Sequence, residues 1–166
     1  MSSPLKSLTL LLFLCGCGFR PLYGDADYRA SDVDYSTVEV GPIPGREGQI
    51  LKAAIEDRLN PKGEMPAREY KLNPTLGVEV TPLSIKEDGT ASRYRVKITS
   101  TYTLVRLTDG KVVDQGKLSR YNSYNVSDAD YSTFVAQQDS IKRSLESLGE
   151  KYFIRISAFF ASENKG

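Results

Sequence analysis

The sequence contains no histidine, no tryptophan and only two cysteines, Cys15 and Cys17. Histidine is the side chain that most often transfers protons near neutral pH, and histidine and cysteine are the usual zinc ligands. Their scarcity argues against histidine-dependent catalysis and the common zinc sites. The sequence also lacks a Ser-His-Asp set and a glycine-rich phosphate loop. It therefore predicts neither a catalytic residue nor a metal site.

The chain also lacks an excess of charge, with 22 basic and 21 acidic residues. Lys6 is the only charged residue before Cys17, so cleavage there would leave 21 of each sign. A neutral total argues against a general nucleic-acid-binding protein. Asp128 and Asp130 could in principle act as paired carboxylates, but a helix start explains them more simply.

A short apolar run, Leu8–Leu14, stands near the start of the sequence and is too short to span a bilayer. It is typical of a signal peptide. The run ends in Leu14-Cys15-Gly16-Cys17, the Leu-x-Gly-Cys pattern of bacterial lipoproteins. The thiol that accepts the lipid must follow a small residue, so Cys17 is the predicted acylation site and Cys15 is discarded. The alternative is an ordinary secretory signal with a disulfide, but one intervening residue places the two cysteines poorly for a bridge.

Hydrophobic periodicity predicts a series of strands and helices from residue 35 onward. The predicted elements, in chain order, are strand 35–40, helix 47–60, strands 70–80, 91–107 and 112–125, and a long helix from 127 to about 160. Pro74 and Pro82 mark the second strand as an edge or bulged strand, and a bulge is expected near Gly116. Ser127 and Asp130 resemble a capping box.

The order β-α-β-β-β-α predicts an α+β sandwich, in which a four-stranded, mainly antiparallel sheet carries both helices on one face. Apolar and polar residues alternate along strand 91–107, and the apolar residues share one parity of the numbering and hence one predicted face: Tyr94, Val96, Ile98, Tyr102 and Leu104. The final helix has an apolar stripe that favours a core position over a lipid groove: Phe134, Ile141, Leu145, Leu148, Tyr152, Ile156 and Phe159. Ser144 is expected on its exposed side, and Gly149 is expected to weaken the helix.

Strand 91–107 also lacks acidic residues, since none occurs between Asp88 and Asp109. Arg93, Arg95 and Lys97 share its polar parity, and the next strand adds two further bases, Lys117 and Arg120. These five residues are the candidate site for an anionic ligand, because arginine binds phosphate bidentately. The alternative is a solvated face whose charges guard against aggregation.

The sequence from Cys17 to Gly24, Cys-Gly-Phe-Arg-Pro-Leu-Tyr-Gly, resembles the mature start of the LptE family of LPS-assembly lipoproteins. A looser resemblance, with Tyr-Asn-Val-Ser-Asp at 124–128 ahead of a long helix, extends over most of the chain. The resemblance implies three parts: a cleaved signal peptide (1–16), a lipidated tether (17–34) and one LptE-like domain (35–166).

The resemblance also implies a function without enzymatic activity. Members of the family partner the barrel LptD in the outer membrane, assist its assembly, sit in its lumen and contact LPS. We therefore expect a protein anchored in the outer membrane, facing the periplasm or lying within the barrel. No cofactor is expected apart from the diacylglycerol thioether and N-acyl chain on Cys17. An envelope lipoprotein that binds another anionic ligand or scaffolds another complex is the alternative, and a carboxylate-dependent hydrolase is a more remote one.

Overall fold

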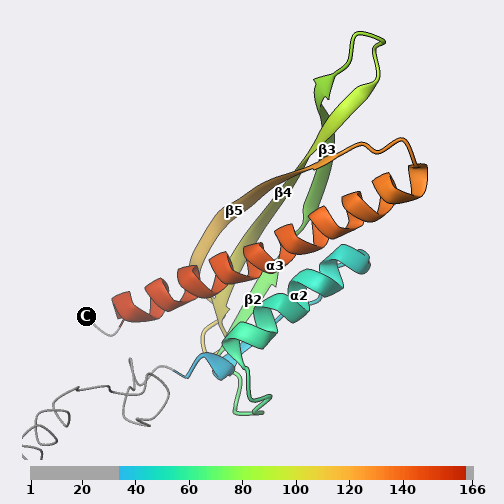
Figure 1. The fold of residues 1–166 in the computed structure, drawn as a ribbon. Helices are drawn as coiled ribbons and strands as arrows, with labels where there is room; N and C mark the ends of the chain where they lie inside the picture. The colour runs from blue at the N-terminus through green and yellow to red at the C-terminus, as the bar shows by residue number, and fades with distance from the viewer. Residues whose placement is uncertain (1–33, 164–166) are drawn as a thin grey trace, which may run out of the picture. The chain divides into compact units, whose positions relative to one another are not determined.

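The computed structural model describes residues 34–163 (Figure 1). The predicted signal peptide, Cys17 and nearly all of the tether lie outside these residues. The described elements are a 3-10 turn (Tyr35–Thr37), β1 (Val38–Val40), α2 (Gly45–Leu59), β2 (Tyr70–Pro74), β3 (Gly77–Ile85), β4 (Ala91–Arg106), β5 (Val112–Asn125) and α3 (Asp130–Glu163). The predicted α+β class is confirmed. Within the described range, no helix is long and apolar enough to cross a membrane.

The long strand β4 is the centre of the sheet. It pairs along one edge with β5, and along the other with β2 and then β3, all antiparallel. The strand expected at 70–80 is therefore two strands, and the second runs on to Ile85. The break follows Pro74, yet the Thr75 amide still donates to the Thr101 carbonyl oxygen at 2.8 Å. The sheet thus has five strands but is four strands wide.

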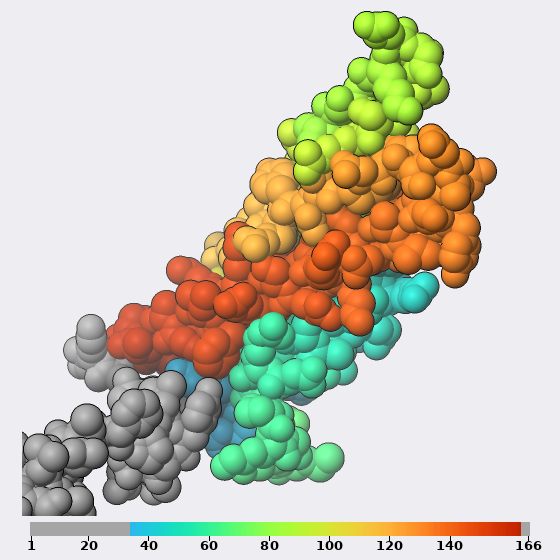
Figure 2. All heavy atoms as spheres, in the orientation of Figure 1, coloured from blue at the N-terminus to red at the C-terminus, as the bar shows by residue number. Residues whose placement is uncertain are grey.

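The one parallel pair joins β1 to β2. A parallel pair requires a crossover connection, and α2 supplies it by returning the chain across the apolar face. Both helices lie on that face (Figure 1). The tip of the β3–β4 hairpin projects beyond them (Figure 2). Its turn is closed by the Gly89 amide, which donates to the Lys86 carbonyl oxygen at 3.0 Å.

The apolar parity of β4 points into the core as predicted, and Val96, Ile98 and Leu104 are completely buried. Ser100 shares this parity and is also buried. The Ser100 hydroxyl is hydrogen-bonded in the core: it lies 2.6 Å from the Tyr152 hydroxyl and donates to the Thr75 carbonyl oxygen. Burial raises the pKa of Tyr152 to about 12. One polar contact therefore joins α3 to the centre of the sheet.

The predicted stripe of α3 is confirmed from Ile141 to Ile156 but not at its ends. Phe134 is 56% exposed, because among residues 34–163 it meets only the first turns of α2, with which it lines an open hollow. At the other end Phe160 is more deeply buried than Phe159. The expectation for Ser144 was wrong, since Ser144 is 2% exposed. α3 packs against both the sheet and α2, so its buried arc is wider than its apolar stripe.

Gly149 is a contact point between the helices and not a weakness of α3. A Cβ atom built on Gly149 would lie 2.8 Å from the Ala54 carbonyl oxygen of α2. Real Cβ atoms do not approach backbone oxygens so closely, so a side chain here would push α2 away. The absence of a side chain at Gly149 thus allows α2 and α3 to pack closely.

Two local predictions were also wrong. The irregularity in β5 lies at Val113, where the register shifts between Leu104–Asp114 and Val105–Val112, and not near Gly116. Gly116 pairs regularly with Tyr102, whose ring fills the space of the missing side chain. The start of α3 is held by Thr133 in place of Asp130, since the Ser127 amide donates to the Thr133 hydroxyl at 2.9 Å.

Candidate functional site

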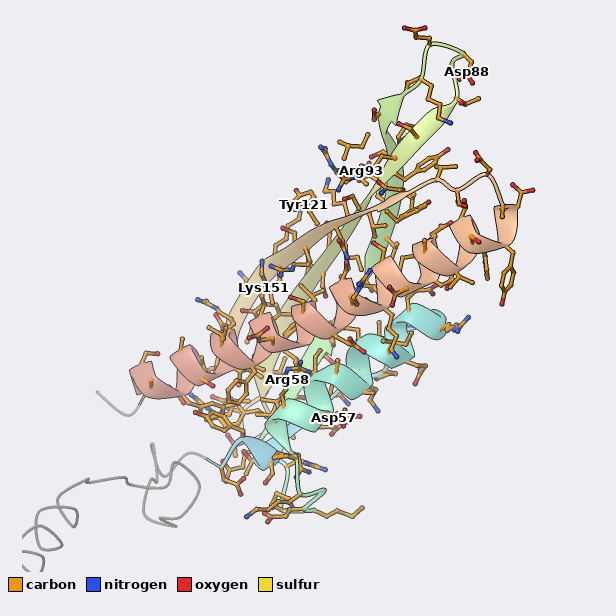
Figure 3. The ribbon with its side chains drawn as sticks, in the orientation of Figure 1. Asp57, Arg58, Asp88, Arg93, Tyr121 and Lys151 are labelled. Carbon is orange, nitrogen blue, oxygen red and sulfur yellow. The ribbon has the colours of Figure 1, made fainter. Side chains whose placement is uncertain are left out.

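The face of the sheet opposite to the helices carries the predicted site, and we call it the open face. Successive side chains of a strand point to opposite faces, and directly paired residues point to the same face. The register therefore assigns Arg93, Arg95 and Lys97 of β4 to the open face, together with Tyr121 and Ser123 of β5. Arg93 and Tyr121 lie along the strands on the side away from the helices (Figure 3).

The three β4 cations differ in their partners. Arg93 donates from Nε and Nη2 to the Ser123 hydroxyl at 3.1 and 2.7 Å, which holds the guanidinium along the sheet. The Lys97 Nζ lies 3.4 Å from a carboxylate oxygen of Glu79 on β3. Arg95 is exposed and makes no hydrogen bond or ion pair to another residue within 34–163. Arg95 is thus the cation of this row most available to a ligand.

The other two candidate residues, Lys117 and Arg120, lie on opposite faces of the sheet. Lys117 pairs with Thr101 and belongs to the open face. Arg120 pairs with buried Ile98, so it points to the helix side of β5, where it is exposed at the sheet edge. The structure therefore brings four of the five candidates together. A separation of three residues in a regular strand already places Lys117 and Arg120 on opposite faces.

The open face has a clear excess of positive charge although the chain is neutral. Its paired rows carry five bases and two acids, a difference of +3: Lys71, Arg93, Arg95, Lys97 and Lys117 against Glu39 and Glu79. Lys71 is itself 3.3 Å from Glu39. The unpaired excess is therefore concentrated on β4 and β5. Such a surface attracts anions, and arginine suits phosphate.

Sequence reasoning did not single out the polar zone beside these cations. Hydroxyl and amide side chains from β2, the break that follows it, β4 and β5 line a shallow hollow of about 710 Å³, which Lys117 also lines: Asn73, Thr75, Thr101, Thr103 and Gln115. The Thr75 and Thr101 hydroxyls are 2.6 Å apart. The alternating threonines of β4 were the available signal. The hollow continues the open face as a hydrogen-bonding surface.

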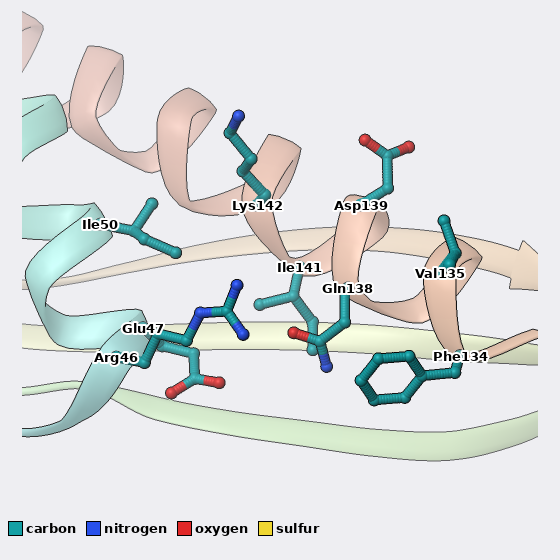
Figure 4. Close-up of a pocket in the computed structure, with 9 residues that line it drawn as sticks. All are labelled: Arg46, Glu47, Ile50, Phe134, Val135, Gln138, Asp139, Ile141 and Lys142. Carbon is teal, nitrogen blue, oxygen red and sulfur yellow. The ribbon is translucent and has the colours of Figure 1, made fainter. Parts of the chain in front are cut away.

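A second hollow, of about 320 Å³, lies between the first turns of α2 and the early part of α3 (Figure 4). Its apolar residues are Ile50, Phe134, Val135 and Ile141. Its rim carries charges of both signs, from Arg46, Glu47, Asp139 and Lys142. This hollow therefore lacks the excess of positive charge that the open face carries. Within residues 34–163, no group of three or more acidic, histidine or cysteine side chains is placed to hold a metal.

The sequence model of the Lipopolysaccharide-assembly family, LptE, matches residues 35–156 of this chain. This range includes all five strands, α2 and most of α3. The chain belongs to the LptE family. Among curated proteins, none matches the chain.

Solved structures agree with the fold of this LptE family member. A protein of Caulobacter crescentus described as a lipoprotein is 23% identical, with a TM-score of 0.63 over 77% of this chain and 93% of its own. The minor lipoprotein of Acinetobacter baumannii is 14% identical, with a TM-score of 0.58, covering 76% and 95%. The rare lipoprotein B of Shewanella oneidensis is 12% identical, with a TM-score of 0.58, covering 78% and 97%. At these identities the likeness concerns the fold alone.

Proposed function

We propose that this LptE family member is a non-enzymatic outer-membrane lipoprotein that works beside the barrel LptD and contacts LPS through the open face. The family match supports the role in LPS assembly. The observation that carries the LPS contact is the excess of +3 on the open face, with Arg95 unpaired among the described residues. LPS presents phosphates on its glucosamine headgroup, and the neighbouring hydroxyl and amide side chains suit a sugar-rich ligand.

The anchor in this proposal is Cys17, acylated after removal of residues 1–16. Burial of acyl chains contributes about 0.8 kcal/mol per methylene, so two or three chains hold a protein almost permanently. Cys17→Ala should leave the protein unprocessed or soluble, whereas Cys15→Ala should give an unchanged mature protein. Mass spectrometry of membrane-extracted protein distinguishes these results, and an unmodified Cys17 would contradict the anchor.

The LPS contact is tested by charge reversal. Arg93→Glu with Arg95→Glu should weaken LPS binding, measured by titration of the purified protein in detergent. Lys62→Glu with Lys111→Glu is a matched control, because both lysines are highly exposed and lie at the end of the domain away from the β4 cations. Only the first pair should lose affinity.

Salt provides a second measurement. Wild-type affinity should fall as salt rises, because the Debye length shrinks from about 10 Å at 0.1 M to about 3 Å at 1 M. Equal affinity for wild type and the Arg93/Arg95 variant would make these arginines a solvated face. Equal binding of an unrelated polyanion would favour another anionic ligand.

Partnership with LptD is tested by purification in detergent. The anchored protein should bring down the barrel in stoichiometric amount, identified by mass. A different stoichiometric envelope protein would favour the scaffold alternative.

A further inference from the structure

The side chains of the open face change in character along β4. Toward the β3–β4 hairpin they are the cations Arg93, Arg95 and Lys97, and toward the other end of β4 they are hydroxyl and amide groups. We call the hollow that the hydroxyl and amide groups line the polar hollow. Its only charged lining residue is Lys117. The charge that suits phosphate is therefore concentrated in one part of the open face, and the polar hollow suits a ligand of another kind.

One row of three paired residues crosses the polar hollow. Asn73 of β2 pairs with Thr103 of β4, and Thr103 pairs with Gln115 of β5. Neighbouring strands are about 4.8 Å apart, so the two amides flank the threonine across about 10 Å. None of these three side chains makes a hydrogen bond to another residue within 34–163. The row thus presents amide donors, amide acceptors and a hydroxyl that can do both.

A row of small residues separates the polar hollow from the cations. Thr99 of β4 pairs with Gly77 of β3 and with Ser119 of β5, so this row rises little above the backbone. The next row carries Tyr121, which is 58% exposed on the open face (Figure 3). Tyrosine combines a flat apolar ring with a polar hydroxyl. Tyr121 therefore places an aromatic surface at the boundary between the cations and the low row.

The distance along β5 sets the size of the ligand. Tyr121 and Gln115 are six residues apart, which is about 20 Å along a strand. A single sugar ring cannot reach from one to the other, whereas a short chain of sugars can. Arg95 lies one row beyond Tyr121, so a ligand of this length also reaches the cations.

We propose that the polar hollow binds the neutral sugar chain of LPS and that Tyr121 packs against one of its sugar rings. The inference rests on the proposed function, which supplies LPS as the ligand. Sugar hydroxyls donate and accept hydrogen bonds, as the side chains of the polar hollow do. One face of a sugar ring carries C–H groups that can pack on an aromatic ring. The phosphates then lie at Arg93 and Arg95, and the sugar chain runs along β4 toward the polar hollow.

The two parts of the open face should also respond differently to salt. A phosphate gains from the guanidinium charge, and salt screens that attraction. A neutral sugar gains from hydrogen bonds between uncharged groups, which salt does not screen. Binding at the polar hollow should therefore be independent of ionic strength.

The experiment uses the acylated protein in detergent and a neutral oligosaccharide as the probe. The probe is the oligosaccharide released from LPS, freed of phosphate and with its carboxyl groups reduced, and its binding is followed by ligand-observed NMR. Thr103→Val with Gln115→Leu removes hydrogen-bonding groups from the polar hollow. The matched control, Thr81→Val with Gln138→Leu, makes the same changes beside Arg95 and on α3, outside the polar hollow. Thermal melts confirm that each variant is folded.

The wild type and the control should bind the probe equally. The Thr103/Gln115 variant should bind it at least about tenfold more weakly, because two or more hydrogen bonds are lost. Tyr121→Ser is a second variant at the other end of the site and should weaken the same binding severalfold. Higher salt should leave the affinity of the wild type unchanged.

The inference would be overturned if the wild type did not bind the probe, if both variants bound it as tightly as the wild type, or if high salt abolished binding. Equal affinity for an unrelated neutral oligosaccharide, maltohexaose, would also overturn it, because the site would then not be specific for the sugars of LPS. The probe carries no phosphate. Failure here is therefore distinguishable from failure of the contact at Arg93 and Arg95, which is measured with intact LPS.

Discussion

The two faces of the sheet differ in burial and in charge. On β4, the side chains of Val96, Ile98 and Leu104 are fully buried under the helices, while alternate residues Arg93 and Arg95 are exposed on the open face. The same backbone supports both, so the difference lies in the alternating side chains and in the helices that cover one face. The helix side sets stability, so the open side can carry charge at little cost in stability.

The largest expected effect comes from placing a charge on the covered side. Leu145 is fully buried, so Leu145→Asp should cost several kcal/mol of the roughly 5–15 kcal/mol that stabilises a domain. Ser132→Asp, exposed in the first turn of α3, should be nearly neutral. Thermal melts compare the two, and equal stability would show that α3 is rotated relative to its core.

A smaller effect is expected where the helices touch. Gly149→Ala should raise helix propensity by about 1 kcal/mol in isolation. Its Cβ would instead meet the Ala54 backbone, so we expect a net loss of about 1–3 kcal/mol. Denaturant unfolding measures the change. A stabilised variant would mean that α2 and α3 are not in close contact there.

The next effect concerns pH. The Tyr152 pKa rises to about 12 on folding, against about 10 for an unperturbed tyrosine. A raised pKa means that the folded state holds the proton more tightly, so this contribution is complete below pH 10 and is lost as pH rises toward 12. The expected slope is up to about 1.4 kcal/mol per pH unit.

Tyr152→Phe should reduce that slope and should also cost about 1 kcal/mol at neutral pH, because the variant loses the contact with Ser100. Burial also raises the pKa of Tyr102, so part of the slope remains. Unfolding free energies measured between pH 8 and pH 11 give both quantities. An identical slope in wild type and variant would contradict the assignment.

The smallest effect on stability is expected on the open face. Arg93→Glu with Arg95→Glu should change the unfolding free energy by less than about 0.5 kcal/mol, because exposed substitutions rarely exceed this. LPS affinity should nevertheless fall, as proposed above. A large loss of stability would show that the Arg93 contacts with Ser123 hold the sheet together and would weaken the contrast between the faces.

The sequence by itself determined most of the elements and the character of the two faces of β4. Alternation along β4 and the repeat from Ile141 to Ile156 are local properties, which follow from the geometry of strands and helices. Alternation places Arg93, Arg95 and Lys97 on one face and shows that Lys117 and Arg120 cannot share a face. The pairing of Lys117 with Thr101 in the structure then decides which of the two joins the β4 cations. The family resemblance rested likewise on a few consecutive residues.

Only the tertiary structure decided which positions are covered and which ends meet. The sequence predicts Ser144 to be exposed and Gly149 to weaken α3, but Ser144 is buried and α2 packs on Gly149 as a second layer that the stripe of α3 does not encode. The break between β2 and β3 depends equally on contacts between distant segments, because the two strands pair with different parts of β4. Burial depends on neighbours in space, so a local sequence pattern predicts it only where a single layer covers the helix or strand.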